Sequence, residues 1–407
     1  MSSASDDNKI LIAGAGIAGL ATALALARSG HCVTLLEKRS GVSQDGAGIQ
    51  IGPNGSRILH SLGVTAKLQQ KIAQPSAIRV MDGVAGRTLA RLPLGETIER
   101  RLGAPYWVLH RADLHEALLA CVGAHNNTAI RYDADVIAAR SHDAGVTVDL
   151  SSGETMQAAL LVGADGLWST LRTRVMGAAP LVFTGKSAFR ALLPANAAPA
   201  SISLTETTIW LRPQAHVVHY PVRGGDELAI VAIFDDQAFG ETWAGDADKT
   251  AVTARTQHFA PPLRDLLQKP DRWRQWSLYT PASAFPWISG RIVLIGDAAH
   301  PLLPFLAQGG VMALEDAVIL AALLQNAGTA QFPERLQRFE AIRRPRTTRV
   351  MQASARNGEI YHQDGWTRRA RDAVLTATPP QLLMQRYDWL YGWTAEAELH
   401  SSGAIDL

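Results

Sequence analysis

Hydrophobic positions at the start of the chain follow a strand–helix–strand order. Ile10–Ala13 is a short apolar run, Ile17–Ser29 has helical spacing, and Cys32–Leu36 is a second apolar run that ends at Glu37. This order predicts a parallel βαβ unit. The uncharged stretch Ile10–Ala27 is long enough to resemble a membrane span, but its glycines at turn spacing favour a buried strand and helix.

The rest of the chain alternates between helical periodicity and short β-rich runs. Glycine-rich Asp45–Pro53 is predicted to be a loop, and Phe183–Phe234, with few helix signals, predicts an inserted antiparallel sheet. From Phe332 onward the pattern is mostly helical, and Pro345 is expected to break or kink it. Further helices are predicted over Asn54–Ser61, Arg111–Val122 and Val311–Gln325, and strands within Ala77–Pro93 and over Val146–Leu150, Ala159–Val162, Thr208–Leu211, His216–Val222, Leu228–Phe234 and Arg291–Ile295.

The glycines after the first strand have the GxGxxG spacing of a dinucleotide-binding turn. In such a turn the first glycine permits the tight bend, the second lets a pyrophosphate approach the backbone, and the third lets the helix pack closely on the strand. Glu37 ends the next strand, where a carboxylate suits the ribose hydroxyls of an adenosine, and a purely structural turn does not explain it. The residues expected to bind the dinucleotide here are Gly14, Gly16, Ala18, Gly19, Glu37 and Lys38.

Two later motifs place an aspartate beside a glycine after a predicted strand. Asp165 lies in the sequence GADG, and Asp297 lies in GDAAHP. Ligands of α/β sheets bind at the carboxyl ends of the strands, where an aspartate can accept hydrogen bonds from ribityl or ribose hydroxyls. Either motif alone could be an Asx turn, but three such sites in one chain favour FAD over NAD as the resident dinucleotide.

Together the three motifs resemble the GxGxxG, DG and GD fingerprints of the class A flavoprotein monooxygenases. The similarity extends to His110–Leu114, Ala307–Gly310, Phe339–Arg346 and Asp388–Gly392. Within that family it is greatest to the group of salicylate hydroxylase, 3-hydroxybenzoate 6-hydroxylase and 6-hydroxynicotinate 3-monooxygenase.

The resemblance assigns roles to several of these residues. It implies that FAD binds non-covalently, that Arg111 contacts the flavin side of the cofactor and that Asp297 holds the ribityl chain. Asp165 would contact both FAD and the nicotinamide nucleotide that reduces it. NADH or NADPH binds only transiently in this family, so no second GxGxxG is expected for it. Gly309 and Gly310 would open a helix toward the flavin, whose positive N-terminus favours the anionic reduced form.

The resemblance also implies the fold. We expect an α/β chain with a Rossmann-like FAD-binding domain of the GR2 type, an inserted antiparallel-sheet substrate domain and a helical C-terminus. The FAD-binding domain would be discontinuous. The predicted boundaries are 1–75, 100–180 and 286–350 for the FAD-binding domain, 76–99 and 181–285 for the substrate-binding sheet, and 351–407 for the helical C-terminal segment.

One strand of the inserted sheet carries the candidate chemistry. Period-two alternation puts His216, Val218 and Tyr220 on one face of this strand and His219 on the other. From the residues alone, a histidine satisfied within a sheet is the more frequent case. The resemblance favours a catalytic pair instead, in which His216 handles a phenolic proton and Tyr220 orients the ring hydroxyl.

The resemblance extends to the substrate pocket. It would be lined by Gln50, Val218, Pro304 and Phe305, with Phe305 as the wall opposite the catalytic strand. Some relatives carry a polar residue at the position of Phe305, so its apolar ring departs from their pattern. Outside the pocket, Trp210 and Trp287 are expected to serve packing, and Arg190 and Arg212 are each a possible carboxylate anchor, although solvated surface is the commoner situation for an arginine.

The function that the resemblance implies is hydroxylation of an aromatic or heteroaromatic ring that is phenol-like and carries a carboxylate. NAD(P)H would reduce FAD, O₂ would form a C4a-hydroperoxyflavin, and one oxygen atom would pass to the ring. Two alternatives stay open, because fold does not fix function. One is an FAD reductase or dehydrogenase that never oxygenates, and the other is a catalytically silent FAD-binding regulator.

Composition excludes several other classes of protein. A net charge of +2, with 47% apolar and 19% charged residues, is ordinary for a globular enzyme and indicates no nucleic-acid partner. The basic run Arg343–Arg349 is interpreted as a solvated helix end. With only Cys32, expected to be buried, and Cys121, we expect no disulfide framework and no metal site. The polar start, Met1–Lys9, is no signal peptide, so we expect a cytoplasmic monomer or homodimer with no membrane partner.

Overall fold

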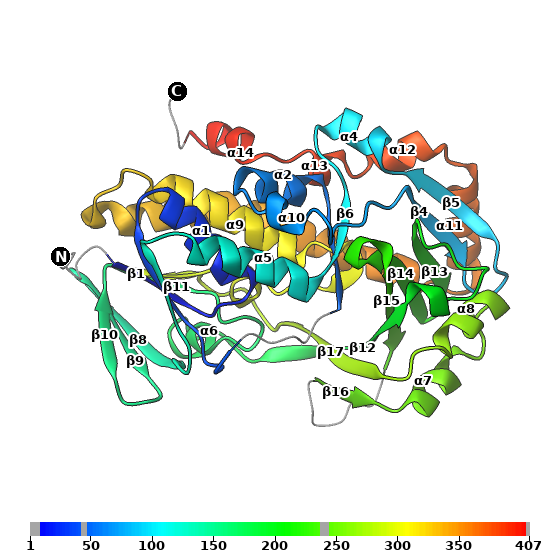
Figure 1. Ribbon diagram of the computed structural model, residues 1–407, viewed down its shortest axis with the longest axis horizontal. Coiled ribbons are helices and arrows are strands. Elements are labelled where there is room, and N and C mark those ends of the chain that lie inside the picture. Colours follow the sequence, from blue (N-terminus) through cyan, green and yellow to red (C-terminus); the bar gives the residue numbers. More distant parts are fainter. Residues whose placement is uncertain (1–8, 42–46, 237–243, 404–407) are drawn as a thin grey trace.

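The computed structural model describes residues 9–41, 47–236 and 244–403 (Figure 1). The polar start before Lys9 and part of the predicted loop at Asp45 lie outside these residues. The described chain forms a mostly parallel sheet covered by helices and a second, larger sheet beside it. Chain segments from several parts of the sequence contribute to each sheet, so the two domains interleave.

The first sheet confirms the predicted βαβ start. β1 (Lys9–Ala13) lies inside the sheet and pairs in parallel with β2 (Cys32–Leu36) and with β11 (Leu160–Gly163). Its apolar residues are fully buried, because helices and strands cover both faces of the sheet. The strand order is β18-β19-β11-β1-β2-β7, with β18 (Ile288–Ser289), β19 (Ile292–Leu294) and β7 (Thr128–Arg131) completing it.

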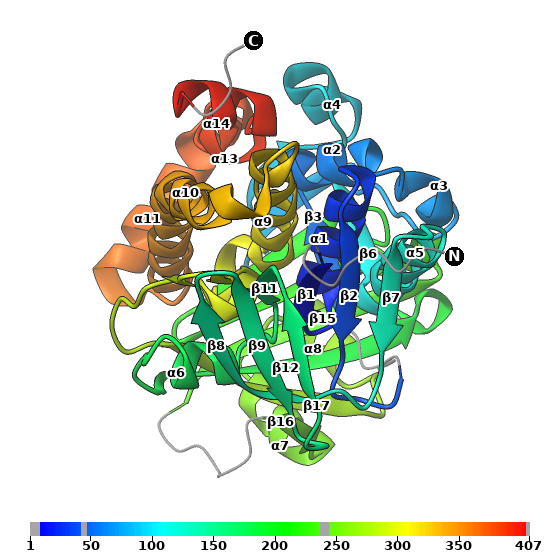
Figure 2. The same ribbon diagram turned by 90° about the vertical axis from the view of Figure 1, so that its left-hand side faces the viewer.

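Helices from three parts of the sequence pack together on this sheet (Figure 2). α1 (Ile17–Arg28) follows the glycine turn and packs against α5 (Arg111–Gly123) and α9 (Gly309–Leu324). All three helices lie where the sequence predicted them to within about two residues. A small antiparallel sheet of β8 (Val136–His142), β9 (Gly145–Leu150) and β10 (Thr155–Ala158) stands at the end of the molecule seen in Figure 2.

The second sheet has eight strands in the order β16-β17-β12-β15-β14-β13-β4-β5. The predicted antiparallel arrangement is correct for every neighbouring pair except β4 and β13, which are parallel. These two strands come from distant segments, and a connection that passes through the other domain leaves their relative direction unconstrained. The strands are β4 (Ala77–Asp82), β5 (Thr88–Pro93), β12 (Leu181–Pro194), β13 (Thr207–Arg212), β14 (Ala215–Val222), β15 (Glu227–Asp235), β16 (Ala244–Ala247) and β17 (Trp273–Pro281).

The two faces of this sheet pack against different partners. Val217 and Trp210 belong to a core with α7 (Lys249–Thr256) and α8 (Pro261–Leu267), on the outer face. Tyr220 packs in a separate cluster on the inner face, toward the FAD-binding domain. The alternation predicted for β14 therefore decides which of its side chains can face a ligand.

The predicted loop Asp45–Pro53 is wrong in its second half. β3 (Gly48–Ile51) is a strand there, paired antiparallel with β6 (Trp107–His110). Glycines at positions 46, 48 and 52, in and beside this short strand, hide its strand character from the sequence pattern. The other helices are α2 (Pro53–Ser61), α3 (Thr65–Leu68), α4 (Glu96–Leu102), α6 (Thr170–Arg174), α11 (Gly365–Ala377), α12 (Pro380–Gln385), α13 (Asp388–Tyr391) and α14 (Ala395–Ser401).

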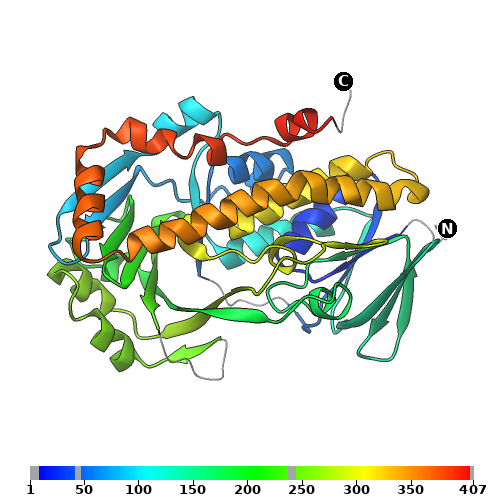
Figure 3. The same ribbon diagram turned by 180° about the vertical axis from the view of Figure 1, so that it is seen from behind.

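The long helix α10 (Phe332–Tyr361) continues through Pro345, so the expected break is wrong (Figure 3). A proline removes one backbone hydrogen bond from a helix, and anchored neighbouring turns can bear that loss. Here Arg343 and Arg346, on either side of the proline, are both buried and paired. The helix also crosses the predicted domain boundary at residue 350.

Two smaller expectations concern Cys32 and the uncharged stretch Ile10–Ala27. Cys32 is exposed at the first position of β2, and the prediction that it is buried is wrong because burial begins one residue later. The stretch Ile10–Ala27 divides into a strand and a helix. In the part of the chain that the structure describes, no helix has both the length and the apolar character needed to cross a membrane.

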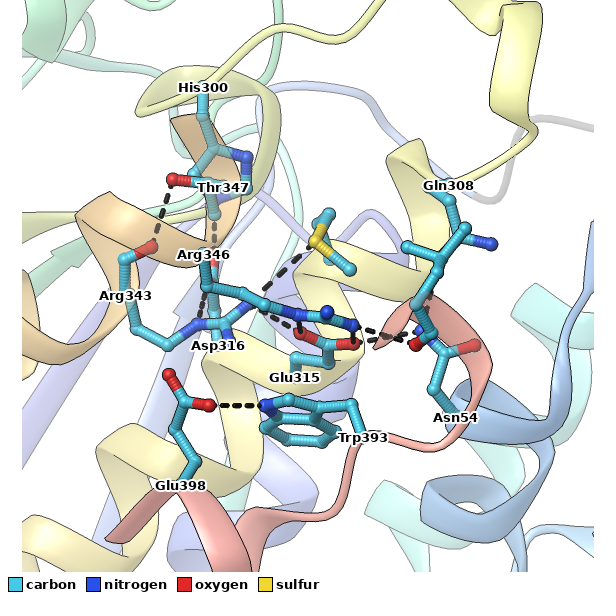
Figure 4. A network of polar contacts seen from close by, with 12 residues as sticks. Asn54, His300, Gln308, Glu315, Asp316, Arg343, Arg346, Thr347, Trp393 and Glu398 are labelled. Atoms are coloured by element: carbon cyan, nitrogen blue, oxygen red, sulfur yellow. Dashed lines mark hydrogen bonds and ion pairs between the residues drawn. The ribbon is translucent and has the colours of Figure 1, made fainter. Parts of the chain in front are cut away.

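Buried acidic residues on α9 connect several elements (Figure 4). Glu315 and Asp316 are adjacent and fully buried. Asp316 accepts a hydrogen bond from the Gly296 N–H at 2.9 Å and is hydrogen-bonded to His300 Nε2 at 2.5 Å. Its other oxygen accepts from Arg343 Nε at 2.8 Å. Burial alone would raise the pKa of Asp316, but these partners lower it to about 2.

The arginines of this network lie in the run Arg343–Arg349, so its interpretation as a solvated helix end is wrong. Arg343 Nη2 and Arg346 Nη2 each lie 2.9 Å from a carboxylate oxygen of Glu315. Asn54, on α2, donates to Glu315 at 2.8 Å. Two buried carboxylates are thus paired with two guanidinium groups, which offsets part of the cost of burying each charge.

We expect Arg343→Ala to destabilise the protein strongly, because it leaves the buried Asp316 carboxylate without its guanidinium partner and Glu315 with only one of its two. Removing one member of a buried pair costs about 3–5 kcal/mol, measurable as a lower urea midpoint. Arg338→Ala is the matched control: it breaks an ion pair with Glu334 whose side chains are 46% and 63% exposed, and should cost less than about 1 kcal/mol. If the two variants lowered the urea midpoint equally, the central role of the network would be contradicted.

Candidate active site

The glycine turn after β1 is shaped by close backbone packing. Gly14 has φ +100°, and a Cβ there would lie 2.5 Å from the Ala164 carbonyl oxygen. A Cβ on Gly19 would lie 1.9 Å from the Gly14 oxygen, whereas one on Gly16 would meet nothing within 4 Å. The first and third glycines are therefore required by packing, and the second leaves the start of α1 open to a phosphate group.

Glu37 holds this turn against the end of β2. One carboxylate oxygen accepts from the Ala15 N–H at 2.9 Å, and the other accepts from the Arg39 N–H at 3.0 Å. Each oxygen keeps a further lone pair for a ribose hydroxyl. Ala18 does not face the same space, since it packs toward Gly296.

A cavity of about 570 Å³ opens at the carboxyl ends of the parallel strands. Its size falls within the range of small-molecule and cofactor sites. It gathers residues predicted separately from the three sequence motifs and adds residues of the second sheet, so it lies between the two domains. Its lining includes Gly16, Glu37, Lys38, Arg111, Asp165 and Asp297.

The two motif aspartates present hydrogen-bond acceptors to this cavity. Asp165 Oδ2 accepts from the Leu171 N–H at 3.1 Å, while its Oδ1 is buried with no hydrogen-bond partner among the described residues. Asp297 is enclosed by protein, yet its carboxylate is open to the cavity. Burial raises the pKa of both carboxyls. An unpaired acceptor and a glycine turn whose first and third positions exclude a side chain fit the hydroxyls and pyrophosphate of FAD.

Arg172 joins the two aspartate motifs, a role that the sequence reasoning missed. Its side chain is 2% exposed. Nη1 donates to the backbone carbonyls of Asp297 and Ala298 at 3.2 and 3.3 Å, and Nη2 donates to the Leu167 carbonyl. Its place at the end of the motif run that begins at Gly163 was the only signal in the sequence.

The N-terminus of α9 begins at Gly309, beside Asp297. A Cβ on Gly309 would lie 3.9 Å from Asp297 Oδ1, and one on Gly310 would lie 2.7 Å from Ile49 Cδ1. The second glycine thus lies close against the Ile49 side chain of β3. The helix points its free N–H groups, and the positive end of its dipole, to the region of Asp297.

His216 lies on the inner face of the second sheet and is 1% exposed. Its ring packs against Phe305 and Tyr361, at centroid distances of 5.6 and 5.2 Å. Nδ1 is hydrogen-bonded to His362 Nε2 at 2.8 Å. Burial, with a further contribution from His362, lowers the pKa of His216 well below its ordinary value, so the imidazole is neutral.

Tyr220 shares this face but lies two pleats away from His216, roughly 13 Å along the strand. Its ring fills the space left by Gly48, where a Cβ would lie 2.3 Å from Tyr220 Cε2. Gln50 is hydrogen-bonded to Tyr220 and accepts from the Tyr106 hydroxyl at 2.7 Å. Burial raises the pKa of Tyr220 to about 12, so its hydroxyl stays protonated.

The predicted substrate-pocket residues lie at two depths. Pro304 lines the cavity, whereas Gln50, Val218 and Phe305 are packed deeper, around the inner face of the sheet. His219 lies on the outer face as predicted, where burial and then Arg79 lower its pKa to about 3.

Arg190 is not on the solvated surface, contrary to the commoner expectation for an arginine. It pairs with Val231, which pairs with Val218, so all three share the inner face. Its guanidinium lies 4.7 Å from the Trp276 ring centroid, it lines the cavity, and its Nε is buried without a hydrogen-bond partner among the described residues. Arg212, half-buried, stacks instead on Phe259 at 5.4 Å.

The fold and this cavity define a flavoprotein in which the cofactor site faces a second sheet. Comparison with known proteins agrees. The model of the FAD binding domain family matches residues 7–354. A 3-hydroxybenzoate 6-hydroxylase of Klebsiella oxytoca is 36% identical over 95% of this chain and 96% of its own. A 6-hydroxynicotinate 3-monooxygenase of Bordetella bronchiseptica is 30% identical over 96% of each chain. A solved substrate complex of salicylate hydroxylase has TM-score 0.82 at 25% identity, covering 99% of this chain and all of its own.

The chain therefore belongs to the FAD binding domain family. Its cofactor is FAD, and it is an NAD(P)H-dependent aromatic monooxygenase that uses O₂. The family resemblance inferred from the sequence motifs is confirmed.

We expect Asp297→Ala to yield largely apo protein, because the variant loses an acceptor that points into the cofactor cavity. An unpaired hydroxyl in a buried site costs roughly 1–3 kcal/mol, which corresponds to about a 5- to 150-fold weaker FAD affinity. Flavin released by acid, measured per mole of protein, checks this. Asp149→Ala, on the small antiparallel sheet, should keep wild-type occupancy. Full occupancy in Asp297→Ala would remove this residue from the cofactor site.

Proposed function

We propose that this chain hydroxylates a phenol-like aromatic or heteroaromatic ring that carries a carboxylate, with His216 as the proton acceptor. The observation that carries the proposal is the inner face of the second sheet. A neutral buried histidine, a protonated tyrosine and a half-buried arginine share this face, and the arginine also lines the cofactor cavity. The names of the relatives describe rings that bear a hydroxyl and a carboxylate.

His216 would accept the proton of the ring hydroxyl. With Nδ1 engaged by His362, Nε2 is the nitrogen left for a substrate. A deprotonated ring hydroxyl makes the ring a stronger nucleophile, and a positioned proton acceptor is worth roughly 10²–10⁴-fold in rate. Phe305 and Tyr361, packed on the imidazole, keep it away from water.

Arg190 and Tyr220 would orient the ring. The Arg190 guanidinium can pair with the substrate carboxylate, and a buried charged pair of this kind is directional and strong. Tyr220 can donate a hydrogen bond to a ring substituent. FAD, when bound, supplies the electron transfer and the oxygen activation. The chain itself would hold the cofactor through Glu37, Asp165 and Asp297.

A substrate screen tests this proposal. NADH or NADPH consumption in air should rise with carboxylated phenols or hydroxypyridines and give a hydroxylated product. Oxidation of NAD(P)H without a new hydroxyl on the ring would favour a reductase. If no compound gives turnover, a silent FAD-binding protein would be favoured. Arg190→Met should weaken binding of the carboxylated ring by roughly 10- to 150-fold, the worth of a charged hydrogen bond. The same change should leave a phenol without a carboxylate unaffected, and Arg212→Met serves as the control arginine.

His216→Ala should keep FAD bound and retain reduction by NAD(P)H, but lose hydroxylation by roughly 10²-fold or more. Electrons would then leave as hydrogen peroxide, so the measurement is the ratio of product to NAD(P)H consumed. His219→Leu is the control, since it changes a buried histidine on the outer face and leaves no ring nitrogen unpaired. Full coupling in His216→Ala would mean that this histidine is only a packing residue.

A further inference from the structure

His216 is the first member of a chain of three hydrogen-bonded side chains. Its Nδ1 lies 2.8 Å from His362 Nε2, and His362 Nδ1 lies 2.7 Å from Asp235 Oδ1. His362 directly follows α10, and Asp235 is the last residue of β15. The three side chains therefore lead from the inner face of β14, past the end of α10, to the end of β15.

The solvent exposure of these three residues rises from His216 to Asp235. The His216 residue is 1% exposed, the His362 side chain 4% and the Asp235 side chain 36%. The sequence places the two histidines 146 residues apart, so no local pattern could indicate their contact. The arrangement connects the deepest polar group of the inner face with solvent.

The hydrogen bonds allow one consistent assignment of protons. If Asp235 is ionised it can only accept, so His362 Nδ1 must carry a hydrogen and its Nε2 must accept. His216 Nδ1 then donates to His362, which leaves His216 Nε2 as an acceptor. The carboxylate at the surface thus sets the tautomer that the buried imidazole needs.

We infer that His362 and Asp235 form a relay that carries the proton of the substrate hydroxyl from His216 to solvent. This inference rests on the proposed function. The substrate O–H bond breaks and its proton binds His216 Nε2, while the Nδ1 proton of His216 passes to His362 Nε2. The Nδ1 proton of His362 passes to the Asp235 carboxylate, and from there to water. One proton enters this series of three side chains and one leaves it, and no group is oxidised or reduced.

The charged groups around the chain suit this direction of transfer. Lys186, on β12, is paired with Asp235 and lies 3.5 Å from His362 Nδ1. Burial raises the pKa of Asp235, but hydrogen bonds from His362 and Lys186 outweigh it, and the net pKa is lowered. Tyr361 packs on the His216 ring and adds no charge, because burial raises its pKa far above neutral. Asp235 therefore releases a proton to water rather than retaining it.

Side-chain replacement at these positions should spare the fold. The backbone carbonyl of His362 accepts from the Gln214 N–H, and its N–H bonds to the Gly358 carbonyl, whatever the side chain. Asp235→Asn preserves the shape of its side chain while removing the charge. FAD absorbance and the thermal midpoint of each variant check that the holoenzyme is intact.

The test measures proton release, without NAD(P)H. Oxidised holoenzyme in weak buffer is mixed with 3-hydroxybenzoate and a pH-indicator dye in a stopped-flow instrument. We expect wild type to release about one proton per bound ligand, as a neutral phenol becomes phenolate. Asp235→Asn and His362→Gln should release it roughly 10²-fold more slowly, the scale of a lost proton-transfer partner. Ligand affinity should change little, and imidazole should restore the rate in His362→Ala.

The outcomes separate the relay from the proposed function. Wild-type release rates in both Asp235→Asn and His362→Gln would overturn the relay and leave His216 as the acceptor. No release from wild type would remove the proton abstraction proposed for His216, and the relay with it. Slow release in His60→Asn, an exposed histidine of α2, or in Asp149→Asn would show a general effect and also count against the relay.

Discussion

The arrangement of the cofactor cavity depends on two adjacent buried carboxylates, Glu315 and Asp316. Charges this deep are tolerated only when partners surround them, so their position dictates where α2, α10 and the GD loop must lie. Asp316 holds the N–H of Gly296, one residue before the carboxylate that faces the cavity. The same helix turns its N-terminus to that loop. The helix α9 thus stabilises the core through its buried carboxylates and helps to form the cofactor cavity through its N-terminus. Cofactor binding therefore depends on an intact core.

The second sheet meets this framework through very close contacts. A Cβ on Gly48 would collide with the Tyr220 ring, and one on Gly310 would press against the end of the Ile49 side chain. The inner face can therefore present its polar groups at a fixed distance from the cofactor cavity.

Local spacing was enough to predict the βαβ start, the glycine turn, the two aspartate motifs and the two faces of β14. Each of these follows from a short period or from a turn that demands glycine. What the sequence pattern missed depends on partners far away along the chain. Arg343 resembles any helix-end arginine until Asp316 is placed beside it, and Pro345 is tolerated only because its neighbours are anchored. Likewise, nothing around His362 indicates that it contacts His216.

The parallel pairing of β4 with β13 has a consequence for biosynthesis. Ile78 pairs with Thr207, and the segment between them belongs largely to the other domain. During translation the hairpin of β4 and β5 keeps the edge of β4 unpaired until β13 has been synthesised, after much of the FAD-binding half. Such long-range pairing slows folding and exposes a strand edge to aggregation. The nascent chain should therefore depend on chaperones during this interval, and production at lower temperature should favour soluble holoenzyme.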